Sequence, residues 1–204
     1  MQLTRPLVLV FCKNPVLGRV KTRLAATIGP EKALKAYQLL IAKTQRILQE
    51  CFVPVAVWHH PAPLPDPDWE SIAIHRFAQV AGDLGQKMNH AFQWAFTSGY
   101  TQVIALGTDL WDLQSADLQQ AFSALQNHST VIGPATDGGY YLLGLSREMP
   151  ELFRNKSWSQ PNLLNETLID LQGKSVFLLP KKNDLDTLQD LQEHPDLWEA
   201  IQSH

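Results

Sequence analysis

The chain has 204 residues, of which 45% are hydrophobic and 18% are charged. This composition is typical of a globular protein rather than a disordered one, and the length predicts a single domain over residues 1–204. The net charge of −3 conceals an asymmetry, because residues 1–46 carry +8 and residues 47–204 carry −11. A basic end and an acidic end together suggest one anionic ligand that is shared with a divalent cation.

Membrane insertion and a disulfide-built fold are both disfavoured. No apolar run reaches the roughly 18 residues that a membrane span needs, and the first residues show no cleavage-type segment, so we expect no signal peptide. The two cysteines, Cys12 and Cys51, provide neither a disulfide framework nor a metal motif. These features predict a protein of the reducing cytoplasm.

The chain begins with an apolar run at 7–11, which predicts a strand buried on both faces. A glycine-bearing basic loop follows it, with turn residues at Asn14-Pro15 and Gly18. Its four cations are Lys13, Arg19, Lys21 and Arg23. Because open sheets bind ligands at the carboxyl ends of their strands, the sequence predicts phosphate binding here.

Strands and helices then alternate along the chain. Later strands are predicted at 53–58, 72–77, 103–106, 130–133, 140–145 and 175–179. Helices are predicted at 31–50, from the 82–85 turn to about 98, at 115–125, 150–154 and 161–171, and after Thr187 and from Pro195. The proline-rich segment 61–68 is predicted to be a surface loop. This alternation predicts an α/β fold of three layers, with a mostly parallel sheet between helices.

Acidic turns follow two of these strands and should lie at the same sheet edge as the basic loop. Asp109 follows the strand 103–106, and Asp184 and Asp186 follow the last strand. Magnesium prefers carboxylate oxygens together with substrate phosphates. We therefore expect Asp109 and Asp186 to place a metal ion, with phosphate oxygens neutralised by Lys21 and Arg23. A turn or helix-capping role suits Asp112 and Asp184 better.

Other motifs are excluded by their spacing. The Lys21-Thr22 pair lacks the preceding glycine of a Walker A loop, and no GxGxxG occurs. The histidines lack zinc-site spacing, and neither Ser115 nor Ser159 lies in a nucleophile elbow. Basic residues are not interleaved with aromatic ones, so nucleic-acid binding is not expected.

Six segments, taken in order, resemble a known family: FCKNPVLGRVKTRL, GDLGQKM, ALGTDLWDL, GPATDGGYYLLGL, LFRNKSWS and NDLDTLQDL. The family is that of small bacterial nucleotide-diphospho-sugar transferase-like proteins with the GT-A fold. It includes arsenosugar biosynthesis glycosyltransferases and transferases associated with radical-SAM and selenium genes. Phospholactate and molybdenum cofactor guanylyltransferases are more distant relatives. The resemblance covers residues 7–191.

The resemblance implies a role for each matched residue. The nucleotide diphosphate would be lined by Lys13, Arg19, Lys21 and Arg23. Asp109 and Asp186 would bind Mg²⁺ or Mn²⁺, and Asp109, Lys21 and Asp137 would be the catalytic residues. Asp137, Gly138, Gly139 and Tyr140 would shape the donor or acceptor pocket, while Trp158 and Ser159 would lie on the acceptor side. One departure is that Leu110-Trp111 replaces the small residue and proline that usually follow the metal aspartate.

These residues leave three functions open. The first is a metal-dependent glycosyltransferase that moves a sugar from a nucleotide sugar to a small-molecule acceptor. The second is a nucleotidylyltransferase that takes a nucleoside triphosphate and releases pyrophosphate. The third is a non-catalytic nucleotide-binding module that has kept the fold. The partners expected are thus a nucleotide sugar or nucleoside triphosphate and a small acceptor, with no nucleic acid and no membrane span; the oligomeric state is left open.

Overall fold

The computed structural model describes residues 4–203, which form strands and helices in alternation. The strands are β1 (Pro6–Lys13), β2 (Val55–His60), β3 (Ala73–Ala78), β4 (Gln102–Leu106), β5 (Thr130–Pro134), β6 (Tyr140–Leu145) and β7 (Val176–Leu178). The helices are α1 (Thr22–Ile28), α2 (Pro30–Cys51), α3 (Pro67–Ile72), α4 (Leu84–Thr97), α5 (Ser115–Ala124), η1 (Pro150–Phe153, a 3-10 helix), α6 (Leu163–Asp170), α7 (Leu188–Gln192) and α8 (Pro195–Gln202).

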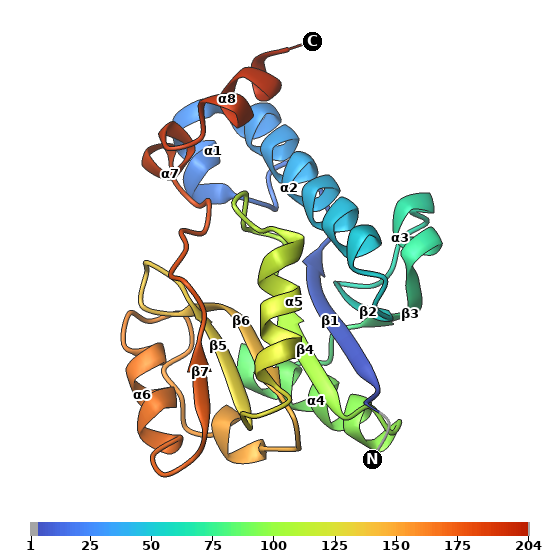
Figure 1. Ribbon diagram of the computed structural model, residues 1–204. Helices are drawn as coiled ribbons and strands as arrows, with labels where there is room; N and C mark the ends of the chain where they lie inside the picture. Colours follow the sequence, from blue (N-terminus) through green and yellow to red (C-terminus); the bar gives the residue numbers. More distant parts are fainter. Residues whose placement is uncertain (1–3, 204) are drawn as a thin grey trace.

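The strands form one sheet in the order β3-β2-β1-β4-β6-β5-β7, with helices on both of its faces (Figure 1). Strand β6 runs antiparallel to β4 and β5, whereas the other neighbouring strands pair in parallel. The predicted three-layer α/β fold with a mostly parallel sheet is therefore confirmed. Because β6 is reversed, its first residue, Tyr140, lies at the sheet edge where β4 ends.

Strand β1 contributes side chains to the hydrophobic core on both faces of the sheet. Val8, Val10 and Cys12 pack toward α2 and α5, while Leu7 and Leu9 pack toward α4 and η1. All five side chains are at most 2% exposed, which explains why the strand reads as a continuous apolar run. The basic loop therefore extends from one of the most deeply buried strands of the fold.

Several boundaries differ from the sequence-based expectations. The loop after β1 is shorter than expected, because residues 22–28 form α1. This helix buries only Leu24, so the sequence shows no apolar periodicity that would predict it. The proline-rich segment ends in α3, whose first turn is capped by the Asp66 side chain. The segment predicted as a helix at 150–154 is a 3-10 turn. None of the helices within residues 4–203 combines the length and apolar character needed to cross a bilayer.

The long helix α2 crosses above the sheet, and the C-terminal helices return to its first turns (Figure 1). Helix α8 packs against α2, and α7 packs against α1. Thr187 caps α7 through a capping box with Asp190, as the sequence predicts. This return brings the end of the chain to the basic loop near its beginning.

Candidate functional site

The basic loop leaves β1 at a point that is fixed by one tyrosine. The hydroxyl of Tyr37, on α2, accepts a hydrogen bond from the Lys13 N–H at 3.0 Å and donates to the Lys13 carbonyl at 3.1 Å. It also lies 3.0 Å from the hydroxyl oxygen of Thr108, which follows β4. Tyr37 is 3% exposed, so these partners satisfy a hydroxyl that has no access to water. The ends of two neighbouring strands are thereby tied together.

The two proposed metal-binding carboxylates are joined through the backbone. Asp109 follows β4, and its carbonyl oxygen accepts a hydrogen bond from the Leu185 N–H at 3.0 Å. Asp186 comes next in the chain, immediately before the cap of α7. The C-terminal segment is thus held against the end of β4, which places the Asp186 side chain beside that of Asp109.

Lys21 lies between these carboxylates. Its ammonium forms ion pairs with Asp109 and, at 3.0 Å, with Asp186. The Lys21 side chain is 4% exposed, whereas those of Asp109 and Asp186 are 47% and 50% exposed. Arg23 approaches the other oxygen of Asp186 at 3.7 Å and is largely exposed. Positive groups from the beginning of the chain and acidic groups from its middle and end therefore converge at one place.

The charges of this cluster act on one another. Burial alone would lower the pKa of Lys21, but attraction to Asp109 and Asp186 outweighs it, so the pKa is raised and the ammonium stays charged. Burial, together with the carboxylates of Asp109 and Asp137, raises the pKa of Asp184 to about 7. Asp184 is a residue that sequence reasoning placed in a turn, and its environment makes it a member of this acidic group.

The remaining loop cations are close in sequence but are not part of the ion-paired cluster. Lys13 and Arg19 are exposed, and neither forms an ion pair with any acidic side chain of residues 4–203. Asn14 anchors the loop between them by donating to the Ala62 carbonyl at 2.8 Å. Both cations are thus available to an anion that approaches from solvent.

The segment Asp137–Tyr140 forms a tight turn before β6. Asp137 accepts a hydrogen bond from the Gly139 N–H at 2.9 Å, which is the geometry of an Asx-turn. Gly138 has a φ of 90°, and a Cβ there would overlap the backbone carbonyl of Pro161. Glycine is therefore required both by conformation and by close approach.

Two buried polar groups, one at the end of this turn and one in the segment that leads to Pro161, lack a hydrogen-bond partner among residues 4–203. They are the hydroxyl of Tyr140 and the indole N–H of Trp158. The nearby hydroxyl of Thr167 already donates to the Leu163 carbonyl at 2.9 Å. Trp158 packs against Gly85 in the first turn of α4, where a Cβ would overlap its ring. Ser159 adopts a φ of 60° in the same segment.

Trp111 stands where the family that the sequence resembles usually has proline, and its side chain contacts residues outside the ion-paired cluster. Its indole N–H donates to Asp196 of α8 at 3.0 Å, and its ring lies under the ammonium of Lys43 at 5.6 Å. Asp112 lies 3.5 Å from the ring nitrogen of His194. These contacts connect the turn after Asp109 to α2 and to the C-terminal segment.

The donor set fits a metal that relies on substrate for some of its ligands. No group of three or more His, Cys, Asp or Glu side chains within the described chain is arranged to hold a metal by itself. Asp109 and Asp186 nevertheless offer two carboxylates that converge on one cation, Lys21. Magnesium characteristically takes one or two carboxylates together with waters and phosphate oxygens. The residues present therefore fit Mg²⁺ or Mn²⁺ bound together with a diphosphate.

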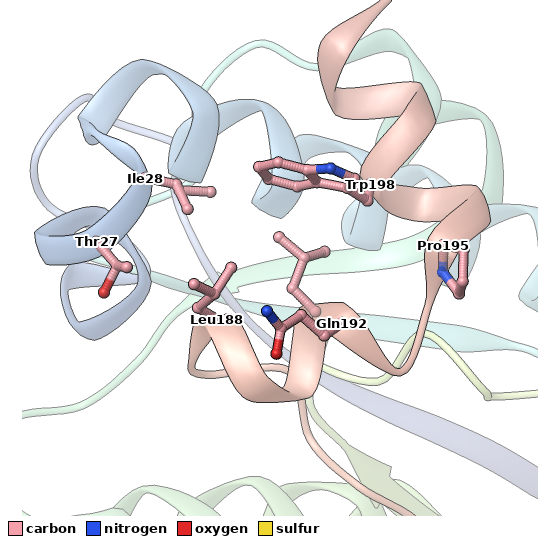
Figure 2. Close-up of a pocket in the computed structure, with 7 residues that line it drawn as sticks. Thr27, Ile28, Leu188, Gln192, Pro195 and Trp198 are labelled. Carbon is pink, nitrogen blue, oxygen red and sulfur yellow. The ribbon is translucent and has the colours of Figure 1, made fainter.

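A separate hollow of about 370 Å³ lies between α1, α7 and α8 (Figure 2). Ile28, Leu188 and Trp198 form apolar walls, and Thr27 and Gln192 contribute polar groups at the rim. None of the residues that line it is charged. A diphosphate needs cationic partners, so the ion-paired cluster, rather than this hollow, is the candidate phosphate site.

Comparison with solved structures defines the fold as that of nucleotide-diphospho-sugar transferases. A protein from Desulfovibrio desulfuricans G20, provisionally named a nucleotide-diphospho-sugar transferase, is 30% identical with a TM-score of 0.84, over 93% of this chain and 85% of that one. A cytidylyltransferase from Leptospira borgpetersenii is 15% identical with a TM-score of 0.59, over 98% and 94%. The manganese complex of Rv0371C from Mycobacterium tuberculosis H37Rv is 12% identical with a TM-score of 0.53, over 93% and 97%. The last two similarities concern the fold alone.

The family model of DUF2064, described as an uncharacterized protein conserved in bacteria, matches residues 43–160. This match covers more than half of the sequence, so the chain belongs to the DUF2064 family. The resemblance that the six sequence segments indicate is thereby confirmed. No curated protein gives a significant match to the chain.

Proposed function

We propose that this protein is a metal-dependent glycosyltransferase that moves a sugar from a nucleotide sugar to a small-molecule acceptor. The observation that carries the proposal is the convergence of Lys21 with Asp109 and Asp186 at the carboxyl edge of the sheet. Cations and carboxylates that meet at a strand-end edge suit a metal-bound diphosphate. The fold shared with a relative provisionally named a nucleotide-diphospho-sugar transferase supports the same class of reaction.

In this proposal each charged group has one task. Asp109 and Asp186 hold Mg²⁺ or Mn²⁺, which when bound neutralises charge on the diphosphate. Lys21 and Arg23 bind phosphate oxygens, and Lys13 and Arg19 attract the donor from the solvent side. These cations stabilise the negative charge that develops on the leaving diphosphate.

The bond changes are those of glycosyl transfer. An acceptor hydroxyl oxygen bonds to the anomeric carbon, and the bond from that carbon to the phosphate oxygen breaks. The nucleoside diphosphate leaves with the bonding electrons. Asp137 is the proposed base for the hydroxyl proton, because only one of its carboxylate oxygens makes a hydrogen bond within residues 4–203. Gly138, Gly139 and Tyr140 shape the space in which the acceptor lies.

A nucleotidylyltransferase is the second candidate, because the fold is also that of a cytidylyltransferase. The same cluster would then hold a nucleoside triphosphate. An acceptor oxygen would attack the α-phosphorus, and pyrophosphate would leave. The two candidates differ in which bond breaks, and therefore in the product released. A non-catalytic binding module would bind nucleotide and release neither product.

A thermal-shift screen separates these candidates. Nucleoside triphosphates and nucleotide sugars are tested with Mg²⁺, with Mn²⁺ and with a chelator, and each hit is assayed for released nucleoside diphosphate or pyrophosphate. The proposal predicts metal-dependent stabilisation by a nucleotide sugar and release of nucleoside diphosphate with an acceptor. Stabilisation by triphosphates alone, with release of pyrophosphate, would favour the second candidate. Binding that ignores the metal and leads to no product would refute both enzymes.

A further inference from the structure

The ammonium of Lys21 occupies the position between the two carboxylates that the proposed function assigns to a metal. Lys21 contacts one oxygen of Asp109 and, at 3.0 Å, one oxygen of Asp186. Its side chain is almost fully buried, although both partners are half exposed. Lys21 also has a left-handed backbone (φ 45°, ψ 45°), which a non-glycine residue adopts only where its surroundings hold it.

A divalent cation and a buried ammonium compete at such a site. Both seek the same carboxylate oxygens, and two like charges a few ångströms apart repel each other, the more so because the Lys21 side chain is shielded from water. A metal that binds both carboxylates must therefore displace the ammonium from at least one of them. A displaced ammonium needs another anion, because an unpaired buried charge is costly.

We infer that Lys21 competes with the divalent metal for Asp109 and Asp186, so that the metal binds tightly only together with a diphosphate that gives Lys21 a new anionic partner. The inference rests on the proposed function and adds an order of binding to it. Free metal is held off by the lysine, and the metal–diphosphate complex is accepted because it moves the lysine onto phosphate oxygens.

Arg23 provides a matched control for the general effect of charge. It also carries one positive charge, but it approaches only Asp186, at 3.7 Å, and its side chain is 72% exposed. An exposed cation is screened by solvent and can turn away from the carboxylate. Competition for a shared position therefore predicts a large effect at Lys21 and a small one at Arg23.

Manganese binding measured by electron paramagnetic resonance tests the inference without any assay of activity. Wild type, Lys21→Met, Lys21→Gln and Arg23→Met are titrated with Mn²⁺ alone and with Mn²⁺ plus inorganic pyrophosphate, against a protein-free baseline. Thermal unfolding establishes that each variant is folded. Without pyrophosphate, both Lys21 variants should bind Mn²⁺ at least about tenfold more tightly than wild type, and Arg23→Met less than about threefold more tightly.

Pyrophosphate should then raise the Mn²⁺ affinity of wild type more than that of the Lys21 variants. Equal or weaker Mn²⁺ binding by folded Lys21 variants would overturn the inference and leave the proposed function in place. Equal gains in Lys21→Met and Arg23→Met would also overturn it, because the effect would then be one of net charge. No Mn²⁺ binding by any of the proteins, with or without pyrophosphate, would refute the metal-dependent function itself and this inference with it.

Discussion

The two sides of the candidate site differ in how completely their polar groups are paired. On the side that the proposed function assigns to phosphate, Lys21 is paired with two carboxylates, and the Tyr37 hydroxyl bonds to Lys13 and Thr108. On the side that the proposed function assigns to the acceptor, the buried groups of Tyr140 and Trp158 have no hydrogen-bond partner within residues 4–203. Satisfied networks rigidify a structure, whereas unpaired groups are where a new partner gains most. Under the proposed function, a ligand would therefore have to exchange existing partners around Lys21, whereas it could add new hydrogen bonds at Tyr140 and Trp158.

The largest expected effect comes from replacing Asp109, the proposed metal-binding aspartate. Asp109→Asn should lower metal-dependent turnover at least about 100-fold, because a neutral amide binds a divalent cation weakly. The thermal unfolding temperature should fall only modestly, because the buried ammonium of Lys21 keeps Asp186 as a partner. Asp112→Asn is the control, since its carboxylate contacts only the His194 ring among the ion pairs described. Wild-type turnover by Asp109→Asn would remove this residue from the mechanism.

A backbone change tests whether the turn on the acceptor side is itself rigid. Gly138→Ala should lower the free energy of unfolding by about 3 kcal/mol, because the added Cβ meets the Pro161 carbonyl in a strained conformation. Gly173→Ala is a matched control, with a φ of 76° and open space around the Cβ, and should cost about 1 kcal/mol. Urea unfolding measures both values. Equal losses of unfolding free energy would mean that the segment around Pro161 moves to accommodate the added Cβ, and that the turn is not rigid.

Acid should lower the free energy of unfolding through the protonation of one histidine, His59. Burial, with a smaller effect of the Arg76 cation, lowers the pKa of His59 from 6.5 to about 4. Below about pH 6.5 the His59 ring therefore becomes protonated in the unfolded chain. In the folded protein the ring stays neutral down to about pH 4. The contribution of neutral His59 to the free energy of unfolding is fully present above pH 6.5. It is lost as the pH drops, by about 2 kcal/mol between pH 7 and pH 5.

His59→Gln should flatten that pH dependence. Urea unfolding of both proteins across the range isolates the contribution of His59, because the other titrating groups are shared. Wild type and variant with parallel stability curves would show that His59 is protonated in the folded state as readily as in the unfolded state.

The smallest expected effect is the loss of one hydroxyl beneath the basic loop. Tyr37→Phe leaves the Lys13 N–H without its partner and should cost about 1.5 kcal/mol of unfolding free energy. Thr44→Val, two turns along the same helix, removes a buried hydroxyl that bonds only to the Leu40 carbonyl of its own helix, and should cost about 0.5 kcal/mol or less. Equal costs would show that the Tyr37 network adds nothing specific to the loop.

The sequence predicts the layers of this fold because its strands are short apolar runs and its long helices are periodic. It does not predict α1, which buries a single leucine, because periodicity cannot be read from one residue. It also does not predict the orientation of Trp111, since its partners Asp196 and Lys43 lie far away in the chain. Side-chain contacts between distant segments depend on packing that no local pattern records.

The candidate site follows the same rule. The convergence of Lys21, Asp109 and Asp186 could be anticipated, because residues at the ends of parallel strands share an edge. Tyr37 could not, since in the sequence it is one more member of the apolar stripe of α2. Asp184 could not be assigned to the site from sequence either, although it is an acidic residue next to a leucine. Its environment depends on Asp109 and Asp137, which only the folded chain brings near.

The hydrogen bond from the Leu185 N–H to the Asp109 carbonyl has a consequence for protein synthesis. Lys21 of the basic loop is synthesised 165 residues before Asp186, the second of its carboxylate partners. A nascent polypeptide would therefore expose the basic loop without its acidic counterpart. Until the segment of Asp186 docks, the growing chain carries the cations of the basic loop without this carboxylate and can attract polyanions such as RNA.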